Sequence, residues 1–119
     1  MLQGNGNEPP ILIVGGGIGG LAAAYALARQ GIPVRVIEQA PEFKEIGAGI
    51  QLGPNIFRAL AKIGLADAVL ADAHRPPAMD MRCALSGERI VHIPLDDPRF
   101  LEKFKYPYAV THRADIHAA

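Results

Sequence analysis

The sequence has a single cysteine, Cys83, and no excess of charge of either sign. Without a second cysteine an intramolecular disulfide cannot form, which fits a reducing cytoplasm, and Cys83 itself is expected to be a small buried hydrophobic residue. The 12 basic and 12 acidic residues balance. Electrostatics therefore gives no reason to expect a nucleic acid or an anionic membrane as a partner.

Metal ligands and an activated nucleophile are also lacking. No serine or cysteine stands beside a base, so no catalytic residue is predicted. None of the four histidines has a thiol or a pair of carboxylates at the sequence spacing of metal ligands; they are His74, His92, His112 and His117. We therefore predict no metal site, and we expect His112 and His117 to be structural or solvent-exposed.

A targeting or membrane segment is not expected either. The apolar stretch Ile11–Ala28 is interrupted by glycines, and no Lys or Arg precedes it. Residues 1–9 are expected to form a disordered tail. Half of the residues are apolar, and 119 residues make one domain at most.

The most informative stretch runs from Ile11 to Glu38. Ile11–Val14 is a short apolar run typical of a strand buried on both faces of a parallel sheet. A helix is expected to begin near Ile18 and to end before Gly31, which suits a left-handed backbone. Val34–Ile37 is rich in β-branched residues and is expected to be the second strand. The order indicates a βαβ unit.

The turn of this unit carries G-x-G-x-x-G at Gly15, Gly17 and Gly20. In such turns the second glycine admits a pyrophosphate, which lies over the N-terminus of the helix, and the third allows close packing of helix and strand. Glu38 stands about 20 residues further on, where a carboxylate accepts hydrogen bonds from adenosine ribose hydroxyls and repels a 2′-phosphate. This predicts a dinucleotide site rather than a merely structural turn, disfavours NADP, and leaves FAD and NAD open.

The rest of the chain gives weaker signals. Residues 40–53 are expected to be irregular, followed by a helix from Pro54 to Gly64 and a shorter one over residues 65–73. Met79–Leu85 and Arg89–Pro94 flank a turn and are expected to form a half-buried β-hairpin. Residues 96–105 are charged and expected to be irregular. A short strand over 108–111 and a helix from 113 should follow.

Four segments together resemble the flavoprotein aromatic hydroxylases, single-component FAD-dependent monooxygenases of the 3-hydroxybenzoate, salicylate and 6-hydroxynicotinate hydroxylase type. The segments are IVGGGIGGLAAA (13–24), VIEQAPEF (36–43), IGAGIQLGPN (46–55) and YAVTHRADIHAA (108–119). The resemblance implies an α/β fold, namely the incomplete N-terminal portion of a Rossmann-like βαβ FAD-binding domain over residues 10–119, with a small β-hairpin insertion. It also implies FAD as cofactor, NAD(P)H as co-substrate, O₂, and a small aromatic acid as substrate.

The resemblance also implies roles for single residues, all of them in cofactor binding. The pyrophosphate would be lined by the glycine turn and the start of its helix, at Gly15, Gly17, Ile18, Gly19 and Gly20. The adenosine end would be held by Glu38 and Gln39. The flavin end would be contacted by Gly49, Ile50 and Gln51, with Arg113 at the ribityl and phosphate groups, where its fork of donors suits phosphate oxygens.

The family's later Gly-Asp segment and its substrate-binding sheet have no counterpart in the 119 residues. We therefore expect the front part of a larger protein, inactive alone, with an oligomeric state that the sequence leaves open. Two alternatives remain: a small, non-catalytic module that binds FAD or NAD, and another flavin class such as an amine oxidase or a disulfide reductase. The segments around Gln51 and Arg113 do not suit the latter class.

Overall fold

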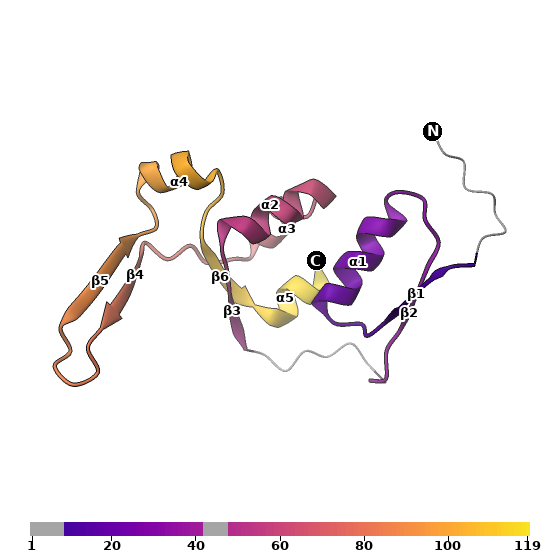
Figure 1. The fold of residues 1–119 in the computed structure, drawn as a ribbon, viewed down its shortest axis with the longest axis horizontal. Coiled ribbons are helices and arrows are strands. Elements are labelled where there is room, and N and C mark those ends of the chain that lie inside the picture. Colours follow the sequence, from indigo (N-terminus) through magenta and orange to yellow (C-terminus); the bar gives the residue numbers. More distant parts are fainter. Residues whose placement is uncertain (1–8, 42–47) are drawn as a thin grey trace.

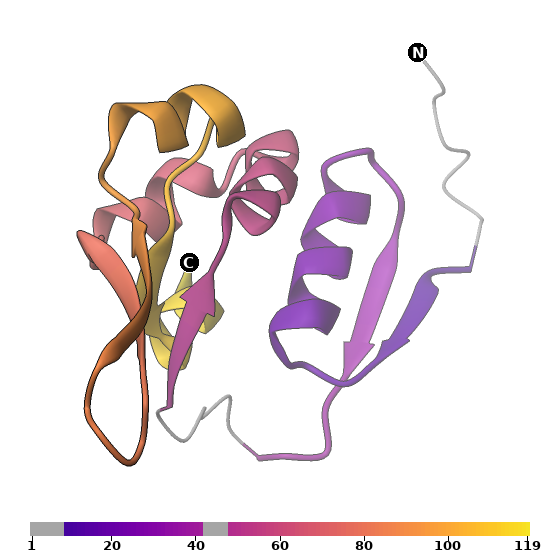
Figure 2. The same cartoon turned by 60° about the vertical axis from the view of Figure 1, so that its left-hand side comes forward.

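The βαβ unit forms the N-terminal part of the molecule. The structure is a computed structural model that describes residues 9–41 and 48–119. Strand β1 (Ile11–Val14) runs parallel to β2 (Val34–Ile37), and helix α1 (Ile18–Ala28) connects them and lies over one face of the pair (Figures 1 and 2). Gly31 has the positive φ, 75°, expected after the helix. The predicted unit is confirmed with its bounds.

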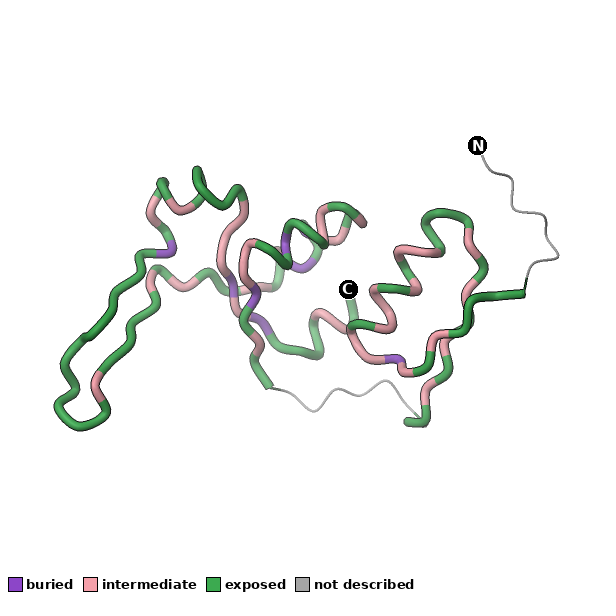
Figure 3. The backbone as a smooth tube through the Cα atoms, in the orientation of Figure 1, coloured by how far each residue is buried: buried purple, intermediate pink, exposed green. Residues whose placement is uncertain are grey.

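A second unit contains the hydrophobic core. Strand β3 (Gly49–Leu52) pairs antiparallel with β6 (Ala109–His112), and helices α2 (Pro54–Ile63) and α3 (Ala66–Ala71) pack beside them. Helix α5 (Arg113–Ala118) follows β6 directly. Most of the buried residues lie here (Figure 3), and Leu52, Phe57, Val69 and Ala109 form one cluster.

The third part is the predicted hairpin with a helix beside it. Strands β4 (Ala78–Arg82) and β5 (Arg89–Pro94) pair antiparallel, and α4 (Pro98–Phe104) follows them. The expectation of an irregular segment over 96–105 was wrong. Asp97 caps α4 by accepting a hydrogen bond from the Arg99 N–H at 2.9 Å, and Pro98 stands in the first turn, so this segment has proper helix-start signals despite its charges.

Residues 40–53 were also expected to be irregular, and β3 corrects that expectation for residues 49–52. A four-residue strand is held by its pairing with β6, which is distant in sequence, so local pattern alone does not reveal it. Residues 42–47 lie outside the described residues. The predicted tail over 1–9 also lies outside them, except for Pro9.

The described residues form three separate two-stranded sheets in an elongated arrangement of 63 × 35 × 20 Å. The radius of gyration is 18.5 Å, against about 14 Å for a compact domain of this length. Strand β1 is not buried on both faces as predicted: Ile11, Leu12 and Val14 are exposed, and α1 lies over only one face of the β1–β2 pair (Figure 2).

The hairpin forms as predicted, but the expectation that it is half-buried is wrong. Met79, Met81 and Ile93, which lie on one face of it, are exposed. Cys83 is half-buried at the hairpin end rather than in a core. Among residues 9–41 and 48–119, no helix combines the length and apolar character needed to cross a membrane.

Candidate functional site

The glycine turn between β1 and α1 is shaped by its own backbone. Gly15 has a φ of 106°, which L-residues rarely adopt, and its N–H donates to the Ile37 carbonyl at 2.7 Å. A Cβ on Gly20 would lie 2.0 Å from the Gly15 carbonyl oxygen. The first and third glycines are therefore required by the turn itself and by the close approach of α1.

The second glycine has a different environment. A Cβ on Gly17 or on Gly19 would meet no atom of the described residues within 4 Å. Gly17 is the N-cap of α1, with an ordinary φ of −72°, and within the described chain no side chain caps this helix end. The turn therefore offers open space in front of helix N–H groups, where a dinucleotide phosphate is favoured.

Gly16, at the centre of the turn, is buried and fixed on both sides. Its N–H donates to Glu38 Oε2 at 2.6 Å. Its carbonyl oxygen lies 2.7 Å from His117 Nε2 on α5. The turn is thus held by the end of β2 and by a helix from the far end of the chain.

Glu38 stands directly after β2, as predicted, and accepts backbone hydrogen bonds with both oxygens. Its Oε1 accepts from the Ala40 N–H at 2.9 Å. The N–H groups of Ala40 and Gly16 and the charge of His117 hold the pKa of Glu38 below its ordinary value, although partial desolvation opposes this. A carboxylate has about four acceptor positions, so Glu38 retains capacity for further donors such as ribose hydroxyls.

The predicted flavin-end residues lie together on the β3–β6 pair and the start of α5. Gly49 pairs with His112 and Ile50 with Thr111, and the N–H of Arg113 donates to the Ala48 carbonyl at 3.1 Å. Gly49 and Gln51 are exposed and Ile50 is half-buried. The structure therefore brings residues 48–52 and 109–113 of the two predicted segments side by side.

Helix α5 connects the two groups of predicted residues. Arg113 begins this helix, and His117 follows four residues later, so both lie on one face of it. The contact of His117 with the glycine turn is absent from the sequence prediction. It joins residues 101 positions apart, so local sequence pattern does not reveal it.

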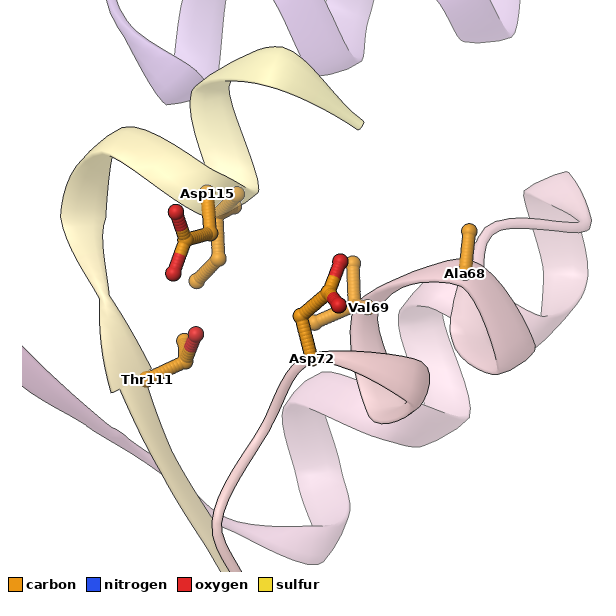
Figure 4. A pocket seen from close by; sticks show the side chains of 6 residues that line it. Ala68, Val69, Asp72, Thr111 and Asp115 are labelled. Carbon is orange, nitrogen blue, oxygen red and sulfur yellow. The ribbon is translucent and has the colours of Figure 1, made fainter.

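Two hollows lie near this region without including the glycine turn. A pocket of about 10 Å³, room for one water, is lined by Thr111, Ile116, α3 residues and the carboxylates of Asp72 and Asp115 (Figure 4). A shallower hollow of about 240 Å³ adjoins it and is lined by Gly49, Asp72, His74, Val110, Thr111 and His112. In the described part of the chain, no three His, Cys, Asp or Glu residues gather to hold a metal.

Comparison with known proteins gives a family match and close relatives. Residues 8–116 match the family model described as FAD binding domain. The chain is 47% identical over 116 residues to 3-hydroxybenzoate 6-hydroxylase of Polaromonas naphthalenivorans (strain CJ2), covering 98% of the chain and 29% of that protein. It is 41% identical over 111 residues to 6-hydroxynicotinate 3-monooxygenase of Pseudomonas fluorescens, covering 93% of the chain and 29% of the relative.

Solved structures agree with these matches. Klebsiella pneumoniae HpxO complexed with FAD and uric acid superposes with a TM-score of 0.78 at 29% identity, over 94% of this chain and 28% of that one. The tetrameric form of 2-methyl-3-hydroxypyridine-5-carboxylic acid oxygenase superposes with a TM-score of 0.78 at 29% identity, over 95% of this chain and 28% of that one. The chain therefore spans less than a third of the length of these relatives.

Proposed function

The chain belongs to the FAD binding domain family, and on this premise we propose that it is the FAD-binding part of a monooxygenase that hydroxylates a small aromatic acid. The reaction class is supported by the names of two relatives, 3-hydroxybenzoate 6-hydroxylase and 6-hydroxynicotinate 3-monooxygenase. In this proposal residues 10–119 are the N-terminal part of the FAD domain, and the substrate domain lies outside them. NAD(P)H and O₂ are the co-substrates.

The glycine turn is the proposed pyrophosphate site. Open space in front of Gly17 and Gly19, together with the uncapped start of α1 at Ile18, suits phosphate oxygens, which need close approach and N–H donors. Gly15 and Gly20 provide the shape of that turn.

The proposed adenosine contacts come from the residues that follow β2. The lowered pKa of Glu38 keeps its carboxylate ionised, and its spare acceptor positions suit two ribose hydroxyls. The same charge would repel a 2′-phosphate, which disfavours NADP at this site. Gln39, the next residue, is exposed and is proposed to contact the same end of the cofactor.

At the other end Gly49, Ile50 and Gln51 would line the flavin, and Arg113 would bind the ribityl and phosphate groups. Bound FAD supplies the redox chemistry, by accepting a hydride from NAD(P)H and reacting with O₂. The residues of this chain bind and orient it. The single cysteine supports a cytoplasmic location. The balanced charge gives no electrostatic reason to propose a nucleic acid or a membrane as a partner.

The environment of Gly17 carries the proposal, because a Cβ there would meet incoming phosphate and no described protein atom within 4 Å. We expect Gly17→Val to leave the circular dichroism spectrum unchanged and to abolish FAD binding in a fluorescence titration. Ala23→Val, which places the same valine side chain at an exposed position of α1, is the control and should bind FAD normally. Unchanged FAD affinity in Gly17→Val would refute the proposed site.

A further inference from the structure

The strongest unassigned contact in the molecule joins His117 to the glycine turn. His117 is half-buried on α5, and its Nε2 lies 2.7 Å from the carbonyl oxygen of Gly16. A carbonyl oxygen accepts hydrogen bonds and cannot donate, so Nε2 must carry the proton and act as the donor. His117 therefore holds the turn with a hydrogen bond of defined direction.

The two groups of Gly16 belong to two different peptide planes. Its N–H is part of the Gly15–Gly16 peptide, which Glu38 holds at 2.6 Å. Its carbonyl is part of the Gly16–Gly17 peptide, whose other polar group is the N–H of Gly17. Since the described peptide bonds are trans, this N–H points away from the carbonyl and hence away from His117.

The geometry points to His117 as a positioning residue for the FAD pyrophosphate. Its hydrogen bond to the Gly16 carbonyl fixes the Gly16–Gly17 peptide, so that the Gly17 N–H is directed to the phosphate. The inference rests on the proposed function, because it assumes that a phosphate lies in front of Gly17. Its role differs from that of Glu38, which orients the preceding peptide.

Helix α5 gives this contact a second consequence. Arg113, proposed to bind the ribityl and phosphate groups, lies one turn before His117 on the same face. The hydrogen bond to Gly16 therefore also sets the position of α5 against the start of α1, two helices that pack together. Loss of the imidazole should loosen both proposed phosphate contacts at once.

The test compares three side chains at position 117 in the complete 119-residue chain. Leucine removes the donor at similar size, glutamine keeps an N–H donor at similar reach, and asparagine keeps the amide but is one methylene shorter. One net hydrogen bond to a buried group corresponds to a change in Kd of about 5-fold or more, so FAD should bind 5- to 20-fold more weakly to His117→Leu and His117→Asn. His117→Gln should stay within about 3-fold of wild type.

A second readout does not depend on FAD. In the cofactor-free, ¹⁵N-labelled protein, the buried Gly16 amide, which Glu38 protects, exchanges with solvent only when the turn opens, and the bond from His117 to the Gly16 carbonyl opposes this opening. The Gly16 amide should therefore exchange about 10-fold faster in His117→Leu and His117→Asn than in wild type or His117→Gln. His92→Leu is the matched control, since it removes an imidazole that bonds to Asp80 in the hairpin, and should change neither value.

The outcomes separate the two proposals. If glutamine and asparagine behave alike, or if all variants keep wild-type Kd and Gly16 exchange, the positioning role of His117 is refuted. If the wild-type chain binds no FAD, the proposed function fails, and the role of His117 as a positioner of FAD fails with it; altered Gly16 exchange would then report only its hold on the turn. A weaker Kd with unchanged Gly16 exchange would also contradict the mechanism.

Discussion

Two neighbouring glycines at the start of α1 should respond to the same substitution with opposite signs. In Gly20→Ala the added Cβ would lie 2.0 Å from the Gly15 carbonyl oxygen and 3.1 Å from its carbonyl carbon. In Gly19→Ala the Cβ meets no atom of the described chain within 4 Å. Both changes occur in the first turn of the same helix, so each serves as a control for the other.

The magnitudes follow from two opposing effects. Replacing a helical glycine by alanine stabilises a helix by up to about 1 kcal/mol, and this gain applies to both variants. Overpacking a close contact costs about 1–3 kcal/mol, and the upper end applies to Gly20 because the obstacle is backbone, held by the bond from the Gly15 N–H to the Ile37 carbonyl. We therefore expect Gly20→Ala to lose about 2 kcal/mol and Gly19→Ala to gain about 0.5–1 kcal/mol.

Urea unfolding followed by circular dichroism measures both free energies of unfolding, and thermal unfolding should show a Tm about 8 °C lower for Gly20→Ala. Gly19→Ala should nevertheless bind FAD more weakly than wild type, since its methyl group faces the proposed pyrophosphate. A Gly20→Ala protein as stable as Gly19→Ala would refute the close approach of α1 to the turn.

Two further predictions concern titrating groups in the hairpin and α4. The Arg99 side chain and the Arg99 backbone N–H lower the pKa of Asp97 from 3.8 to about 2. The stability that this cap contributes should be present above pH 4 and lost as the pH falls towards 2. In urea unfolding, Asp97→Ala should remove that pH dependence. The Ser86 hydroxyl, with the backbone N–H groups of Ser86 and Leu85, lowers the pKa of the Cys83 thiol to about 7. The rate of iodoacetamide labelling, plotted against pH, should have its midpoint near pH 7, and Ser86→Ala should move this midpoint upwards. An unchanged midpoint in Ser86→Ala would contradict this cause.

The sequence was sufficient where structure is decided locally. The bounds of β1, α1 and β2 could be predicted because the turn glycines, Gly31 and the β-branched run of β2 act within a few residues of where they stand. The start of α4 was equally local, since Asp97 and Pro98 are ordinary helix-start residues, but the surrounding charges outweighed them in the prediction.

Features that depend on distant contacts could not be predicted. Strand β3 exists through its pairing with β6, and the bond between His117 and Gly16 joins residues 101 positions apart. The exposure of Val14 has the same origin, because an apolar strand is buried only where other elements cover it. For the candidate site, the motifs therefore predicted which residues take part, whereas only the structure shows how Glu38 and His117 hold Gly16.

The central claim is that this chain binds FAD through the glycine turn and its neighbours, and a direct titration tests it. Isothermal titration calorimetry of the purified chain with FAD and, separately, with NAD measures both dissociation constants under one condition. The proposed contacts of Gly49 and Gln51 with the flavin would be available to FAD alone, so we predict a lower Kd for FAD than for NAD. Equal or tighter binding of NAD would contradict the account.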